Sequence, residues 1–383
     1  MAEELPKIPN IDLTQLRFTA LNGPAAERSE AKAKLLAAIK ADNMAPFYEH
    51  IADELGLGKD ASLLAALKGE NAVELKKLED KLEDAQTNLG ETEISDALAA
   101  KAYYLAKIGD KERALEAFKV AIEKTGPLGH RIDLHFAVVR IGFFFGDKDL
   151  ISKWIDKVKG LVKEGGDWDR CNRLKVYEGI FMLSNREFKG AINLLLDSIA
   201  TFSSSELMTY KAFVRYTALA ATLTLNRPDF KTKIVNAPEV LEVVHEIPNM
   251  SEYITSYYGC KYAQLFKALA LMEQDIKADH FLHAHYKYYV REMRIRVYGQ
   301  LLESYHSLTI ESMANLFGVS EGWIDNDLSC FISAGRLHAV IDKVGGVIES
   351  SRPDAKNAQY QSSIKQGDLL LTRIQKLSRV INV

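Results

Sequence analysis

Apolar residues recur three and four positions apart along most of the chain, which is the period of an α-helix. Between residues 71 and 89 they alternate with dense Glu, Asp and Lys, which predicts an amphipathic helix with a solvated charged face. No strand pattern of comparable strength occurs before about residue 335. We therefore expect the first 300 residues to be helical and the fold to be all-α in class.

A weak repeat occurs inside this helical region. Gly-Asp pairs at residues 109–110 and 146–147 are suited to turns between paired helices, and small residues between them allow close helix packing. The copies are longer than a tetratricopeptide repeat of about 34 residues, so we expect helical pairs of relaxed length that stack into a solenoid. An irregular bundle with chance spacing is the alternative. The copies align on Ala114, Ile151 and Ala191.

The pattern changes near residue 298 and predicts a winged helix over residues 298–350. Thr309 and Ser320 are suited to begin two successive helices. Residues 336–342 then alternate like a strand, and Gly345-Gly346 turns the chain into a return strand. Helix, turn, helix and hairpin together are typical of a winged helix.

The charges of this predicted winged helix argue against DNA binding. The chain has no Lys or Arg between Val297 and Gly335, and the second helix carries Glu321, Asp325 and Asp327 instead. Phosphates repel acidic side chains, and base edges are read mainly by Arg and Lys. We expect the winged helix to pack against proteins and the chain to bind no nucleic acid.

Residues 351–383 read as a polar linker followed by an amphipathic helix. This helix could fold back on the wing, present its stripe to helices of other chains, or lie on a membrane. We favour partner helices, because the helix follows a linker, and Asp368 and the modest charge make a membrane the weakest alternative. The apolar stripe consists of Tyr360, Ile364, Leu371, Ile374, Leu377, Val380 and Ile381.

Composition narrows the class of protein. The chain of 383 residues is 47% hydrophobic and 26% charged with a net charge of −3, which fits an ordered globular protein without a chain-wide electrostatic affinity for nucleic acid. Its three cysteines are too far apart for a disulfide framework. The N-terminus lacks the apolar core of a secretory signal, and the apolar runs are too short to span a membrane. We expect a soluble protein of the cytoplasm and nucleus.

The sharpest candidate for chemistry is a histidine cluster, His280, His283 and His285, which could supply zinc ligands. The last two also begin the metalloprotease signature of deubiquitinating enzymes, but Met293 and Arg296 stand where that signature needs Ser and Asp. Residues two apart on a helix point in nearly opposite directions. We therefore expect surface or interfacial histidines, no metal, no cofactor and no catalytic residue.

Two other segments look like sites but have structural explanations. Residues 165–170 place carboxylates beside a tryptophan, yet Gly-Gly ends one predicted helix there and Asp167 or Asp169 is suited to begin the next. Residues 286–296 interleave Tyr with Arg and Lys and could contact nucleic acid. We interpret this segment as a helix that links the solenoid to the winged helix.

A solenoid followed by a winged helix and a terminal helix resembles the PCI-domain proteins shared by the proteasome lid, the COP9 signalosome and translation initiation factor three. Longer motifs resemble those of the PCI-domain non-ATPase subunits of the 26S proteasome regulatory particle. The resemblance extends over nearly the whole chain and is weakest up to about residue 42. The motifs are residues 43–46 (NMAP), 164–170 (EGGDWDR), 172–177 (NRLKVY), 288–294 (YYVREMR), 332–342 and 375–382 (QKLSRVIN).

The resemblance implies a non-catalytic scaffold subunit of the lid that supports ubiquitin-dependent proteolysis. Its partners would be other PCI-domain lid subunits and the proteasome base, and the deubiquitinating activity would belong to a different subunit. The N-terminal arm would reach toward the base or neighbouring lid subunits. Winged helices of this family pack edge to edge, which implies contacts along residues 336–347, including Arg336, His338 and Val340. Its C-terminal helices form a bundle, which implies contacts at Tyr360, Ile364, Leu371, Ile374, Leu377 and Ile381.

Two alternatives stay open. The first is the equivalent scaffold of the COP9 signalosome, and a zinc hydrolase is a distant second. The expected organisation is an N-terminal helical segment (1–65), a helical-repeat solenoid (66–297), a winged helix (298–350) and a linker with the bundle helix (351–383). The PCI domain would cover about residues 190–350, including the last repeats.

Overall fold

A computed structural model describes residues 6–56, 60–88, 90–351 and 355–381. The chain forms two compact units. One contains Met1–Gly259 and Ala268–Tyr288, and the other contains Cys260–Lys267 and Tyr289–Val383.

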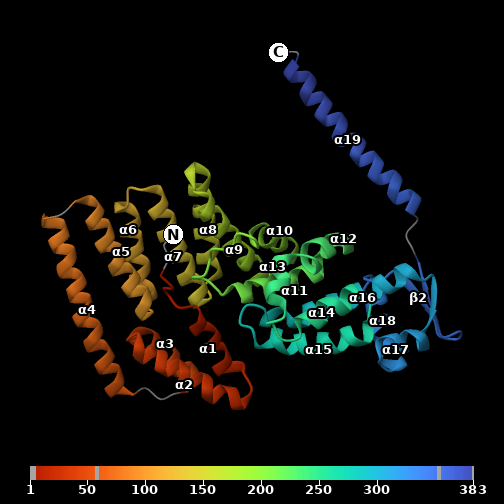
Figure 1. Ribbon diagram of the computed structural model, residues 1–383, viewed down its shortest axis with the longest axis horizontal. Coiled ribbons are helices and arrows are strands. Elements are labelled where there is room, and N and C mark those ends of the chain that lie inside the picture. Colours follow the sequence, from red (N-terminus) through yellow and green to blue (C-terminus); the bar gives the residue numbers. More distant parts are fainter. Residues whose placement is uncertain (1–5, 57–59, 89, 352–354, 382–383) are drawn as a thin grey trace. The chain divides into compact units, whose positions relative to one another are not determined.

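In the first unit, the regular secondary structure of the described residues is helical, as predicted (Figure 1). It also includes a π-helical turn at Lys231–Val235 and a 3₁₀ turn at His283–His285. Its helices are α1 (Asp12–Asn22), α2 (Ala25–Ala41), α3 (Ala45–Leu55), α4 (Ala61–Asn88), α5 (Glu91–Ile108), α6 (Lys111–Lys124), α7 (Leu128–Phe145), α8 (Lys148–Gly165), α9 (Trp168–Ser184), α10 (Phe188–Ser198), α11 (Tyr210–Thr224), α12 (Arg227–Phe230), α13 (Pro238–Val244) and α14 (Met250–Tyr258).

Two Gly-Asp turns make the predicted helical hairpins. Gly109 ends α5 at φ 81° and Gly146 ends α7 at φ 71°, in the left-handed region that glycine adopts without strain. The next residue begins the following helix in each case. Asp110 accepts a hydrogen bond from the backbone N–H of Arg113, and Asp147 accepts one from that of Leu150. The sequence prediction of these turns is confirmed.

Small residues let the paired helices approach closely. A Cβ added to Gly142 on α7 would lie 2.7 Å from Ile151 on α8, and one added to Gly179 on α9 would lie 2.7 Å from Leu195 on α10. Ala114, which aligns the first repeat, is fully buried. Close packing of this kind stabilises each hairpin by dispersion and by removal of apolar surface from water. The helical-repeat prediction is therefore confirmed.

The N-terminal helices α1–α3 pack against the solenoid of the same chain. The ring of Phe47 on α3 lies 4.9 Å from that of Phe144 on α7, within one apolar core. The backbone of α3 also lies close to the α5–α6 turn, because a Cβ on Gly109 would meet the Cβ of Phe47 at 2.7 Å. On α1, Gln15 donates a hydrogen bond of 2.6 Å to the carbonyl oxygen of Ala278.

The second unit contains the predicted winged helix. Its small antiparallel sheet has the order β1-β3-β2. The wing hairpin pairs Ala339 with Ser350 and Asp342 with Val347. Two further helices, α15 (Tyr262–Ala278) and α16 (Tyr286–Ser304), contain residues of both units. The other elements of this unit are β1 (Ser307–Thr309), α17 (Ile310–Phe317), α18 (Glu321–Ser333), β2 (Ala339–Asp342), β3 (Val347–Ser350) and α19 (Ala355–Ile381).

Two details differ from the sequence prediction. Strand β1 was missed, because its three residues form a strand only by pairing with β3, where Leu308 faces Ile348. Thr309 caps α17 as expected, accepting a hydrogen bond from the N–H of Ser312. Ser320 precedes α18, but its side chain makes no capping hydrogen bond. The core of this winged helix includes the fully buried Met313, Ile324, Leu328 and Ile348.

Candidate protein-interaction surfaces

The C-terminal helix α19 is 27 residues long, and its described side chains are all exposed. An amphipathic helix of a globular protein normally buries its apolar stripe, so an exposed stripe of this length is a candidate binding surface. The large apolar side chains, exposed by 57–75%, are Tyr360, Ile364, Leu369, Leu370, Leu371, Ile374, Leu377, Val380 and Ile381.

The spacing along α19 follows heptads. Tyr360, Ile374 and Ile381 are separated by multiples of seven, and Ile364 and Leu371 are separated by seven. Leu377 shares this face, and so does Leu370 one heptad earlier, which the sequence analysis did not single out. The spacing of seven residues between Leu370 and Leu377 is the sequence signal that would have identified Leu370. A seam with this period is the pattern by which one helix packs along another.

The wing offers a second surface. Strand β2 is at the edge of the described sheet, because its hydrogen-bonded neighbour is β3. Val340 on β2 is 60% exposed, and Val344 at the tip of the hairpin is fully exposed. An edge strand presents unpaired backbone groups that another protein can engage.

Of the three residues expected on this edge, only Val340 lies within β2. Arg336 and His338 precede the strand, and both are exposed. Arg336 forms an ion pair with Glu292 on α16. Its guanidinium group is therefore engaged within the chain, where it fixes the start of the wing.

Two of the three acidic side chains of α18, Asp325 and Asp327, have structural partners. Asp327 accepts hydrogen bonds of 3.0 Å from Arg294 and from the hydroxyl group of Tyr298. Burial raises the pKa of Asp327, which the charge of Arg294 opposes, and burial beside Asp327 raises the pKa of Tyr298. Asp325 pairs with Lys343 of the wing at 3.0 Å. These contacts fix α18 within the winged helix.

The three candidate zinc-binding histidines make separate hydrogen bonds. His280 bonds Gln15 and Thr14 of α1, His283 bonds the carbonyl oxygen of Lys277 at 2.7 Å, and His285 bonds that of Ser184 at 2.9 Å. Among the described residues, no group of three or more His, Cys, Asp or Glu side chains is arranged to hold a metal ion. The cluster in the sequence is thus dispersed over different neighbours in the structure.

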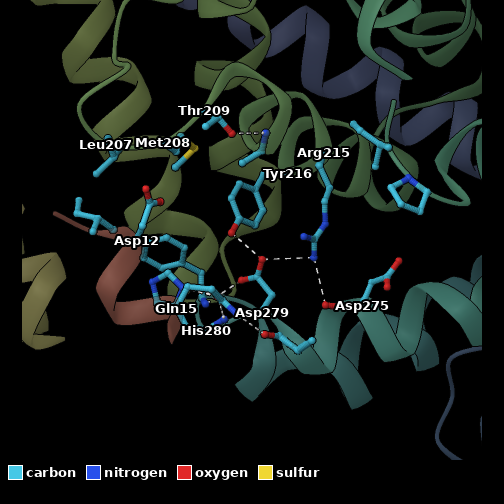
Figure 2. A pocket seen from close by; sticks show the side chains of 16 residues that line it. Asp12, Gln15, Leu207, Met208, Thr209, Arg215, Tyr216, Asp275, Asp279 and His280 are labelled. Carbon is cyan, nitrogen blue, oxygen red and sulfur yellow. Dashed lines mark hydrogen bonds and ion pairs between the residues drawn. The ribbon is translucent and has the colours of Figure 1, made fainter. Parts of the chain in front are cut away.

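A pocket of ≈410 Å³ lies where α1, the start of α11 and the end of α15 meet (Figure 2). The buried carboxylate of Asp279 accepts hydrogen bonds from the backbone N–H groups of Phe281 and Leu282. Arg215 of α11 lies 3.3 Å from the same carboxylate and donates to the carbonyl oxygen of Asp275. The polar groups of this pocket thus connect the elements around it.

The two other segments singled out in the sequence are structural as well. Asp167 is the residue before α9, and Arg170 forms a bidentate ion pair with Asp133 of α7. Tyr288 in the basic aromatic segment stacks on Phe188 at 6.0 Å, with the guanidinium group of Arg186 over its ring. Both segments therefore contribute contacts within the first unit.

Among the described helices, none combines the length and the apolar content that a membrane crossing requires.

Three family models match consecutive parts of the chain. "26S proteasome subunit RPN7" matches residues 60–233, and the PCI domain matches residues 256–352. The model of the "26S proteasome regulatory subunit RPN7/PSMD6 C-terminal helix" matches residues 359–381, which lie within α19. The exposed apolar stripe is thus part of a segment for which the family has its own model.

Full-length relatives agree with these matches. The 26S proteasome non-ATPase regulatory subunit 6 of Oryza sativa subsp. japonica is 50% identical over 100% of this chain and 99% of the relative. Its Arabidopsis thaliana homolog is 50% identical over 94% of this chain and 93% of the relative. The regulatory subunit RPN7 of Saccharomyces cerevisiae is 35% identical over 98% of this chain and 94% of the relative. These names favour the proteasome over the COP9 signalosome, and the chain belongs to the family of 26S proteasome non-ATPase regulatory subunit 6, also called RPN7.

Proposed function

We propose that this chain is a non-catalytic scaffold subunit of the proteasome lid. It supports assembly of the regulatory particle and, through it, ubiquitin-dependent protein degradation in the cytoplasm and nucleus. Its partners are other PCI-domain lid subunits and the proteasome base, with no nucleic acid and no membrane. The family and the names of the relatives support this function.

The observation that carries the proposal is the apolar face of α19. Its described side chains are exposed, and the family's C-terminal helix model matches residues 359–381 within the helix. Burying a large apolar side chain contributes about 1.5–3 kcal/mol. A helix with this many exposed apolar residues gains substantially when it packs against other helices. The proposed bundle contacts are Tyr360, Ile364, Leu371, Ile374, Leu377 and Ile381.

The wing supplies the second proposed contact. The edge of β2 and the exposed side chain of Val340 fit edge-to-edge packing with another winged helix. His338 adds an exposed side chain beside this edge, and Arg336 contributes through its ion pair with Glu292. Both proposed surfaces bind protein, and neither brings together groups suited to catalysis.

A double substitution on α19 tests the assembly role. We expect Leu371→Asp with Ile374→Asp to weaken incorporation into the regulatory particle by about 100-fold or more, because two charges would have to be buried in the bundle. The measurement is co-sedimentation of the tagged chain with lid and base subunits from cells. The helical repeats should remain folded, because both side chains are exposed in the isolated chain.

A matched control separates lost packing from added charge. Thr372→Asp with Gln375→Asp adds the same charge to the polar face of α19 and should leave incorporation unchanged. Normal co-sedimentation of the Leu371 and Ile374 variant would rule out the proposed bundle. Equal loss of incorporation in both variants would show that added charge, and not lost apolar packing, causes the effect.

A further inference from the structure

Arg140 is a fully buried arginine in the middle of α7. A guanidinium group removed from water needs opposite charge or hydrogen-bond acceptors around it. The charge of the buried Glu206 lies nearby, and its Oε1 accepts a hydrogen bond of 3.0 Å from Tyr177. The charges of Arg140 and Glu206 both lie close enough to Tyr177 to influence the pKa of its hydroxyl group. Among the described residues, Arg140 and Glu206 nonetheless form no direct ion pair.

The acceptor that Arg140 uses comes from the N-terminal segment of the chain. Its Nη1 donates a hydrogen bond of 3.1 Å to the backbone carbonyl oxygen of Pro6, which precedes it by 134 residues. The same carbonyl oxygen accepts the N–H of Ile8 at 2.8 Å. Pro9 and Ile11 are buried, so residues 6–11 lie against the helices. Figure 1 shows this N-terminal segment beside α7, before it leads into α1.

A cavity of ≈650 Å³ borders this contact. Its walls come from α5, α7 and α9, and Pro6 forms part of them. Within the described part of the chain, the Nε and Nη2 atoms of Arg140 are buried without a hydrogen-bond partner, and so is the Nε of Arg173, which lines the cavity. Buried donors without acceptors cost free energy. The Nη1 bond to the Pro6 carbonyl oxygen therefore matters to this guanidinium group, which among the described residues also interacts with the hydroxyl group of Tyr103 on the cavity wall.

We infer that Arg140 is a latch and that residues 6–11 are a strap which it holds across α7. The bond between a charged donor and a backbone carbonyl is stronger than a neutral hydrogen bond, and here the donor is fully buried while the acceptor lies at the surface. The strap closes one side of the cavity, and its attachment depends on Arg140. Because the strap continues directly into α1, the latch also positions the N-terminal helices.

Trypsin tests the latch directly, because Lys7 is exposed within the strap and cleavage after it requires the strap to lift. The experiment uses the full chain and follows loss of residues 1–7 by intact mass. We expect Arg140→Lys to accelerate this cleavage by about tenfold, since lysine keeps the charge near Glu206 but is too short to replace the fork of arginine. Arg113→Met, which alters an exposed arginine of α6, should cleave like the wild type.

A double-mutant cycle, measured by thermal denaturation, provides the second test and does not depend on protease access. We expect Arg140→Lys to lower Tm in the full chain and to have less than half that effect in a chain lacking residues 1–6, because the acceptor is then absent. Circular dichroism verifies that each variant is folded. Cleavage of Arg140→Lys at the wild-type rate, or equal Tm losses with and without residues 1–6, would overturn the latch.

Discussion

The hydroxyl group of Tyr216 donates a hydrogen bond of 2.6 Å to Oδ2 of Asp279. Tyr216 lies on α11 and Asp279 follows α15, so this bond joins segments 63 residues apart across the pocket in Figure 2. Both side chains are buried, and burial next to Asp279 raises the pKa of Tyr216 well above its usual value. The phenol therefore remains a proton donor at every physiological pH.

Tyr216→Phe should destabilise the first unit. The substitution keeps the ring but leaves the buried carboxylate of Asp279 with one donor fewer, which costs about 1–3 kcal/mol of unfolding free energy. Tyr210→Phe is the control, because the Tyr210 hydroxyl makes only long contacts of 3.4 Å. Urea denaturation of the two variants measures the difference. Equal stability of both variants would show that the bond to Asp279 contributes nothing.

Gly109→Ala should be strongly destabilising. Alanine at φ 81° is strained, and its Cβ would lie 2.7 Å from the Cβ of Phe47. We expect the unfolding free energy to fall by about 2 kcal/mol or more. Gly160→Ala is the matched control, since Gly160 is exposed inside α8 with open space around it. That substitution should raise stability by about 0.5–1 kcal/mol, so thermal denaturation should move the two variants in opposite directions.

Local signals in the sequence were sufficient for much of the fold. The turn at Gly109 and Asp110 and the helix start at Thr309 depend on residues within four positions of each other, so their patterns could be read directly. Strand β1 could not, because its three residues acquire strand geometry from β3, about 40 residues later. Pairing over that distance leaves no periodic pattern in so short a segment.

The residues of the candidate surfaces, too, could be recognised from the sequence only where their signal is local. The stripe on α19 could be recognised from the helical period of its apolar residues. Leu370 was missed, although it lies seven residues before Leu377 and therefore on the same face. Arg140 and its contact with Pro6 gave no sequence signal, since one arginine within an apolar helix looks like any other charged residue. His280 was expected to be a surface or interfacial histidine, but its partners Thr14 and Gln15 lie more than 260 residues earlier and could not be read from the sequence.

Acid should weaken the first unit through His280. Burial lowers the pKa of His280 below its usual 6.5, although the charge of Asp279 opposes this. The unfolded chain therefore binds more protons than the folded chain as pH falls below that value, and stability is lost. Asp12, Asp275 and Arg215 are charged residues that line the same pocket.

His280→Gln should reduce this pH dependence. Glutamine cannot take up a proton, so its unfolding free energy should fall less than that of the wild type between about pH 7.5 and about pH 5.5. His135, whose pKa burial also lowers, remains and should preserve part of the slope. Urea denaturation at both pH values gives the comparison. An unchanged slope in the variant would exclude His280 as its source.

The wing prediction depends on the proposed scaffold role. Val340→Asp should weaken incorporation into the regulatory particle by about tenfold, because a charge would be buried where β2 meets a neighbouring winged helix. The stability of the isolated chain should change little, since Val340 is 60% exposed on an edge strand. Leu316→Asp makes a similar change on the exposed face of α17 and should incorporate normally. Co-sedimentation and thermal denaturation of both variants distinguish a lost contact from a lost fold: equal incorporation of the two would exclude the β2 edge from the interface.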